Sequence, residues 1–140
     1  RYSSLFDTFS LAQDIRFIPV YNGENMSFFE SNVFMEKDDI DNVDLSKNEI
    51  FIRQAINVGD FGKLTIMPDG KVYANVNMPS LGTIDDSPYS IVYKEFTNGE
   101  SWFRLRVQNP CENCVYQWLC PSPSNYEIVI DRPNLCHVRN

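Results

Sequence analysis

Residues 110–138 read PCENCVYQWLCPSPSNYEIVIDRPNLCHV, and this stretch contains every cysteine of the chain. The four are Cys111, Cys114, Cys120 and Cys136, in the spacing C-x2-C-x5-C-x15-C. A C-x2-C pair places two sulfurs on one tight turn, which suits two corners of a tetrahedral metal site or of an iron–sulfur cube. Two further thiols in the same segment complete a four-thiolate set. The spacing therefore predicts a metal site over residues 111–136.

Other interpretations of these cysteines remain open from the sequence. Two disulfides would need an oxidising compartment, and four unrelated buried thiols are a third alternative. Spacing does not separate zinc from iron–sulfur, because both accept four thiolates. His137 directly follows Cys136 and is an alternative ligand, although a lone histidine beside a site more often lies outside it. Four bulky residues between the cysteines are expected to wall the site from water: Val115, Tyr116, Trp118 and Leu119.

Upstream of the cysteines, the sequence predicts a β-hairpin. Residues 64–67 and 71–74 alternate in the manner of strands, and Pro68-Asp69-Gly70 between them supplies turn residues. Proline fixes φ at the second turn position, and glycine takes the positive φ that the turn requires. An exposed edge of this hairpin, over Leu64–Asn75, would be able to accept an extended peptide as an additional strand.

Short helices are predicted on both sides of the hairpin. Ser46 and Glu49 have the spacing of a capping box, which predicts a helix that runs to about Asn57. Ser87, followed by proline, predicts a second helix over residues 88–96 that ends near Gly99. The chain thus has the pattern of an α+β protein built around a small hairpin.

The remaining segments are less regular. Residues 14–20 read as a strand, and apolar side chains at helical spacing predict a helix over residues 25–37. Residues 102–107 are ambiguous between strand and helix. After Pro110 the chain is rich in Cys, Pro, Ser and Asn, which predicts a cysteine-rich, metal-binding loop without regular structure.

Composition and charge exclude several classes of protein. The chain has 140 residues, of which 43% are hydrophobic, enough for one folded domain with a real core. Its net charge of −7 disfavours binding to a phosphate backbone, so no nucleic-acid partner is expected. No stretch approaches the roughly 20 apolar residues of a transmembrane helix, and no signal peptide is recognisable, so we expect a cytoplasmic protein with no membrane partner.

The sequence favours a binding module over a self-contained enzyme. It holds one histidine, no G-x-S-x-G nucleophile motif and no glycine-rich phosphate loop. The chain begins with Arg1 rather than Met, and its opening reads like the middle of a protein. We therefore expect a fragment of a longer chain, with no catalytic residues within these 140 positions.

The run NPCENCVYQWLCPSPSNYEIVI…NLCHV resembles the C-terminal half of a SPASM domain, the auxiliary-cluster extension of radical SAM peptide-modifying enzymes. The hairpin LTIMPDGKVYANV followed by LGTI resembles the first half of that domain. The resemblance covers about residues 59–138. It implies that residues 46–140 form a SPASM-like domain, and that residues 1–45 are the strand-and-helix end of an upstream, partial TIM-barrel-like domain.

The chain departs from the family's cysteine pattern in an ordered way. That pattern is C-x9–15-G-x4-C, then C-x2-C-x5-C-x3-C, then a last C. Gly70 is present, but the cysteine expected after four intervening residues is Asn75, and the x3 cysteine is Ser124. No cysteine precedes Gly70. In the family these missing positions serve one auxiliary cluster, while the four cysteines retained here serve the other. The resemblance thus implies one [4Fe–4S] cluster, with Zn²⁺ as the alternative.

The combination is similar to the pseudo-radical SAM proteins of Bacteroidales peptide-maturation systems, which lack the catalytic C-x3-C-x2-C motif. The resemblance implies a non-catalytic accessory domain that binds a precursor peptide, a partner maturase or both. Two alternatives remain: the C-terminal part of an active radical SAM maturase, and a zinc-stabilised protein-interaction adaptor.

Overall fold

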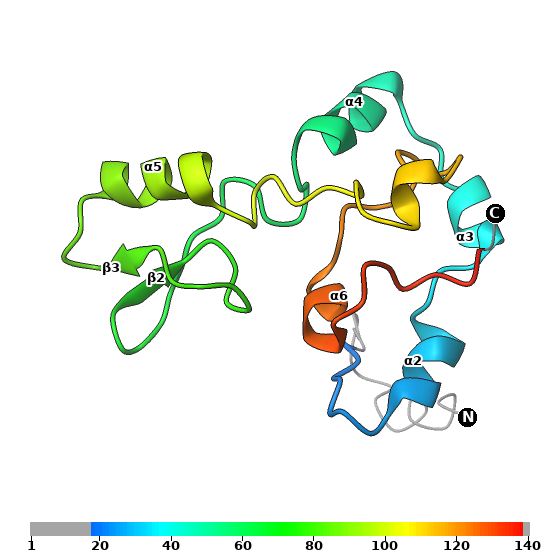
Figure 1. The fold of residues 1–140 in the computed structure, drawn as a ribbon, viewed down its shortest axis with the longest axis horizontal. Helices are drawn as coiled ribbons and strands as arrows, with labels where there is room; N and C mark the ends of the chain where they lie inside the picture. Colours follow the sequence, from blue (N-terminus) through cyan, green and yellow to red (C-terminus); the bar gives the residue numbers. More distant parts are fainter. Residues whose placement is uncertain (1–17, 139–140) are drawn as a thin grey trace, which may run out of the picture.

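The computed structural model describes residues 18–138, and within them the chain is a small α+β protein (Figure 1). The helices are α2 (Met26–Asn32), α3 (Lys37–Asp41), α4 (Lys47–Ala55), α5 (Pro88–Asn98) and α6 (Asn125–Ile130), with a 3-10 helix, η2 (Cys111–Asn113). The strands are β1 (Thr65–Ile66), β2 (Lys71–Tyr73) and β3 (Gly82–Thr83). The sheet and α5 lie at one end of the molecule, and α2, α3 and α6 lie toward the other.

The predicted hairpin is confirmed, although its strands are short. Strand β1 pairs with β2 in antiparallel register, with Thr65 opposite Tyr73. Gly70 has a φ of 80°, which a residue with a side chain rarely adopts, so the turn requires the glycine that the sequence places there. The sequence did not predict the third strand: β3 pairs antiparallel with β2, with Gly82 opposite Val72.

Helix α5 begins as predicted and extends two residues beyond the predicted Phe96. The Ser87 hydroxyl accepts a hydrogen bond from the Ser90 N–H at 3.1 Å, which caps the helix, and Pro88 occupies the first turn. The helix ends against Gly99, where a Cβ atom would lie only 2.2 Å from the Glu95 carbonyl oxygen. Only glycine therefore allows the chain to turn away from the helix so closely.

A buried carboxylate on α5 holds the segment that follows the helix. Glu95 is 2% exposed, and its Oε1 accepts the N–H groups of Ser101 and Trp102 at 2.9 and 2.8 Å. Trp102 packs edge-on against Phe96, with 5.4 Å between ring centroids. Residues 102–107, which the sequence left undecided between helix and strand, form neither. At the start of this segment, backbone N–H groups donate to the Glu95 side chain instead of to the carbonyl oxygens of a helix or a neighbouring strand.

Helix α4 begins at the predicted capping box and ends at Ala55. Ser46 Oγ accepts from the Glu49 N–H, and the Glu49 carboxylate accepts from the Ser46 N–H at 2.9 Å. Beyond the helix, Asn57 is 1% exposed and donates to the carbonyl oxygens of Arg104 and Pro123 at 3.3 and 3.0 Å. This one amide joins three segments that are far apart in the sequence.

A second core holds the opposite end of the molecule together. Its centre is Phe29, fully buried, with Phe34 and Leu135 beside it. The Phe29 ring meets Tyr126 of α6 edge-on at 5.2 Å, and the Tyr126 hydroxyl donates to the Pro19 carbonyl oxygen at 2.7 Å. Residues 18–45 therefore pack directly on the C-terminal segment. Their assignment to a separate, partial TIM-barrel-like domain stays a prediction.

The single helix predicted over residues 25–37 is wrong at its C-terminal end. Met35 is extended and forms a parallel bridge with Cys136, donating its N–H to the Leu135 carbonyl oxygen at 3.0 Å. Glu36 then starts a new helix, α3, in a capping box with Asp39. Of the predicted strand over residues 14–20, residues 14–17 lie outside the described part of the chain, and residues 18–20 are not in a strand.

The prediction of a loop throughout the segment after Pro110 is also wrong in part, because residues 125–130 form helix α6. The helix begins at a capping box in which the Glu127 carboxylate accepts from the Ser124 N–H at 2.6 Å. It ends at Asp131 in the left-handed conformation, with a φ of 56°. The S-x-x-E spacing is the same signal that identified α4, but the surrounding loop-like composition obscured it.

Candidate metal centre

All four cysteines line one cavity of about 500 Å³. Cys111 and Cys120 are each 8% exposed, Cys114 and Cys136 are partly exposed, and all four are free thiols. The structure thus brings together every residue that the sequence predicted for the site. The other residues that line the cavity are Met35, Ile40, Arg106, Pro110, Gln117, Asn134 and Val138.

Local turns position the first three thiols. The Cys114 N–H donates to the Cys111 carbonyl oxygen at 3.0 Å, closing the C-x2-C turn around η2 as the spacing predicted. Further along, the Cys120 N–H donates to the Tyr116 carbonyl oxygen, also at 3.0 Å. Two successive turns therefore bring the three sulfurs to the same side of one short loop.

The fourth thiol comes from a different part of the fold. Cys136 lies in the parallel bridge with Met35, and its sulfur accepts the Val138 N–H at 3.2 Å. The bridge follows directly on the core residues Phe34 and Leu135. The core around α2 therefore carries Cys136 to the cavity.

Two side chains from outside the loop and one within it brace the loop. Arg53 of α4 donates to the Leu119 carbonyl oxygen at 2.5 Å. Arg106 Nε donates to the Pro121 carbonyl oxygen at 2.6 Å, and Gln117 returns a hydrogen bond to the Arg106 carbonyl oxygen at 2.6 Å. Because these bonds fix the chain on both sides of Cys120, the cavity is supported by the rest of the fold.

The four thiols line one cavity but are not grouped as a metal site. Among residues 18–138, no three histidine, cysteine, aspartate or glutamate side chains are grouped so that they could hold a metal ion. A zinc ion needs its four sulfurs at about 2.3 Å from one point. The four sulfurs thus border one cavity without forming such a group.

Burial shifts the pKa of two of these thiols. It raises the pKa of Cys120 to about 11, with a further increase from the other three cysteines, while the Arg106 charge opposes the rise. Burial also raises the pKa of Cys136. Without a cation in the cavity, both groups are neutral at physiological pH, so metal binding there must release protons.

Metal-free, reduced protein is expected to lose stability in alkali. Since the Cys120 pKa is higher in the folded state than in an unfolded chain, its contribution is complete below about pH 9 and is lost as the pH rises to about 11. Urea midpoints measured between about pH 8 and pH 11 check this expectation. A Cys120→Ala variant should show a shallower decline, and equal slopes for the two proteins would contradict the assignment.

The walls of the cavity differ from those predicted. None of Val115, Tyr116, Trp118 and Leu119 lines it, and Val115 is 81% exposed. Met35, Ile40 and Val138 supply the apolar surface instead. No local sequence signal could have identified Met35 or Ile40, because their place beside the cysteines depends on the bridge to Cys136.

His137 lies outside the cavity. Its Nε2 is 2.6 Å from the Glu30 carbonyl oxygen, and its ring packs against Phe34 with 5.3 Å between centroids. These contacts place the histidine on the core side of the chain, whereas Cys136 faces the cavity. The site as it stands therefore has four sulfur donors and no imidazole donor.

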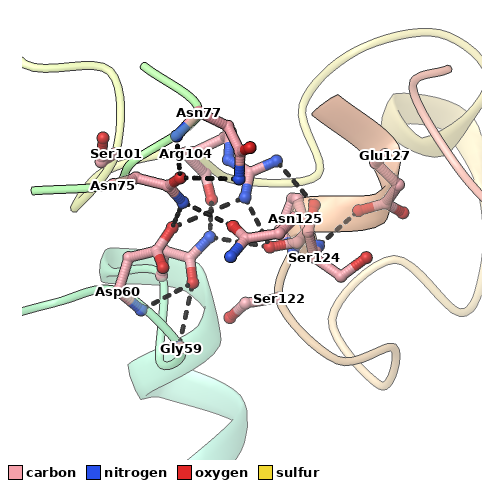
Figure 2. Close-up of polar contacts among 12 residues, drawn as sticks. Gly59, Asp60, Asn75, Asn77, Ser101, Arg104, Ser122, Ser124, Asn125 and Glu127 are labelled. Atoms are coloured by element: carbon pink, nitrogen blue, oxygen red, sulfur yellow. Dashed lines mark hydrogen bonds and ion pairs between the residues drawn. The ribbon is translucent and has the colours of Figure 1, made fainter. Parts of the chain in front are cut away.

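A buried polar network lies between the hairpin and α6 (Figure 2). Asn75 is 4% exposed and donates from Nδ2 to Asp60 Oδ2 at 2.9 Å and to Asn125 Oδ1 at 2.5 Å. Arg104 lies within 3.5 Å of the same Asp60 carboxylate and donates to the Ser124 carbonyl oxygen at 3.1 Å. The network thus joins the segment after α4, the hairpin and the start of α6.

Comparison with family models, with curated proteins and with solved structures gives no match for this chain. Its function is therefore argued from the residues themselves. In the part of the chain that the structure describes, no helix is long and apolar enough to cross a membrane.

Proposed function

We propose that this chain is a non-catalytic, SPASM-like accessory domain of a pseudo-radical SAM protein in ribosomal peptide maturation, with one [4Fe–4S] cluster held by Cys111, Cys114, Cys120 and Cys136. The observation that carries the proposal is that four free thiols from two parts of the fold line one cavity. Four cysteine thiolates are the usual ligands of such a cluster. The donor set thus fits the group chemically.

A cluster and a single zinc ion require different arrangements of the four sulfurs. The described residues offer no group of donors that could hold one ion, yet all four sulfurs border a common cavity. In a cluster the four irons stand between the thiolates, so the thiolates bind different atoms and need not meet at one point. Four sulfurs that border one cavity are compatible with this larger group.

The polar network gives independent support to the SPASM-like resemblance. The family's missing first cluster would draw ligands from the segment before the hairpin, from position 75 and from position 124. Here Asp60, Asn75 and Asn125, which adjoins Ser124, are linked by hydrogen bonds. The three segments that the pattern would join are thus in contact, through amides and a carboxylate in place of cysteines.

Full cysteine ligation implies a structural or electron-transferring role. A bound cluster would supply one-electron chemistry, and no coordination position would remain for a substrate. The chain's own residues would enclose the cluster, with Met35, Ile40 and Val138 excluding water on the apolar side. Four cysteines without a disulfide suit a reducing compartment, and the proposal includes a cytoplasmic location for that reason.

The edge of β1 is the surface we propose for a precursor peptide or a partner maturase. The Met67 N–H donates to the Lys71 carbonyl oxygen at 2.9 Å, so by the alternation of an antiparallel ladder the backbone groups of Ile66 point away from β2. The Ile66 side chain is 63% exposed. An extended segment would pair with these groups and cover this side chain.

The test is the metal and acid-labile sulfide content of protein purified without oxygen. We expect about four irons and four sulfides per chain. One zinc without sulfide would favour a zinc-stabilised adaptor instead. Absence of metal, with thiols that oxidise in pairs even under reducing conditions, would overturn the metal site and leave two disulfides as the explanation of the cysteines.

A further inference from the structure

A buried arginine stands at the wall of the cysteine cavity. Arg106 is 6% exposed and lines the cavity together with all four cysteines. Its guanidinium interacts electrostatically with Cys111 and Cys120. A positive charge held inside the protein is little screened by salt, so it acts strongly on any charge within the cavity.

The arginine is held in place by a buried carboxylate. Its Nη1 is 2.9 Å from Glu127 Oε1, and the two side chains are 5% and 4% exposed. The second oxygen of that carboxylate accepts the Ser124 N–H at 2.6 Å, so the start of α6 fixes the carboxylate. Arg106 lines the cavity with all four cysteines, whereas Glu127 lines a neighbouring pocket that it shares with Arg106 and Cys111.

We infer that Arg106 raises the reduction potential of the cluster in this cavity, an inference that rests on the proposed function. Reduction adds one electron from an external one-electron donor, and the cluster with its four thiolates becomes more negative by one charge. A cation at the cavity wall stabilises the reduced state more than the oxidised state. Glu127 moderates this effect by holding a compensating negative charge beside the guanidinium.

The alternative is that the pair only braces the fold, since Arg106 also bonds to the Pro121 carbonyl oxygen. Stability measurements do not separate the two roles, because a lone buried charge destabilises a protein whatever its function. The reduction potential does separate them. The informative variants are Glu127→Gln, which leaves the arginine charge uncompensated, and the double variant Arg106→Gln with Glu127→Gln, which removes both charges and keeps polar side chains at both positions.

The experiment is a potentiometric titration of the anaerobic, iron-loaded protein, followed by electron paramagnetic resonance. At a fixed potential, Glu127→Gln should raise the ratio of reduced to oxidised cluster. The double variant should have a ratio at least tenfold lower than Glu127→Gln, a shift of about 59 mV for one electron. The control is Lys71→Gln with Asp69→Asn, an ion pair in the hairpin turn whose residues do not line the cavity and whose removal should leave the ratio unchanged.

The iron content of each protein shows whether a negative result contradicts the role of Arg106 or the proposed function itself. If the double variant keeps its iron and its ratio stays within twofold of that of Glu127→Gln, the role of Arg106 is overturned while the proposed function stands. If the double variant loses its iron, Glu127→Gln alone decides: an unchanged ratio overturns the inference, and a raised ratio supports it. Wild-type protein without iron would overturn the proposed function itself.

Discussion

Replacing Cys114 with serine is expected to lower the iron content from about four atoms per chain to fewer than one. The hydroxyl is a poor substitute for a thiolate, and the C-x2-C turn would supply one sulfur instead of two. Because a bound metal group contributes its binding free energy to folding, the variant should also lose more than about 4 kcal/mol of stability. Iron and sulfide analysis, with anaerobic urea unfolding, measures both effects.

The matched control for this variant lies in the same loop. Val115 is adjacent to Cys114 in sequence but is 81% exposed and does not line the cavity. Val115→Ser should therefore keep the full iron content and change stability by no more than about 0.5 kcal/mol. Retention of four irons by Cys114→Ser would show that this thiol is not a ligand.

Replacing Phe29 with alanine is expected to damage the fold and the metal centre together. The side chain is fully buried, and its ring contacts Tyr21 and Tyr126 at 5.4 and 5.2 Å between centroids. Truncation of such a residue costs about 3–5 kcal/mol. The iron content should also fall by more than about half, because the same core holds the bridge that carries Cys136.

Phe51 provides the comparison for this prediction. It is the same residue type on α4, but its side chain is 65% exposed. Phe51→Ala should change the free energy of unfolding by no more than about 0.5 kcal/mol and leave the iron content unaltered. A loss of less than about 1 kcal/mol in Phe29→Ala, with full iron content, would mean that the core does not hold Cys136 in place.

Features set by neighbouring residues could be predicted from the sequence. The capping serines of α4 and α5 and the glycine of the hairpin turn act within three or four residues of their partners. The C-x2-C turn is equally local. Spacing in the sequence is enough to identify such features, because the chain between the partners is too short to allow many arrangements.

Features set by distant partners could not be predicted. Helical spacing alone continues through Met35, and only its pairing with Cys136 shows why the helix stops before it. The place of Arg106 beside the cysteines has the same origin, since it depends on contacts with Pro121 and Glu127. Helix α6 is different: its capping signal was present in the sequence, and the loop-like composition around it outweighed that signal.

The parallel bridge between Met35 and Cys136 has a kinetic consequence. The bridge closes a loop of about a hundred residues, whereas the hairpin and the turns around Cys111, Cys114 and Cys120 join residues close in sequence. Contacts of long sequence separation form late, because the entropy of loop closure must be overcome first. During folding, three thiols should therefore be assembled before the fourth arrives, and the time at which Cys136 becomes protected from a thiol-modifying reagent should report the completion of the fold.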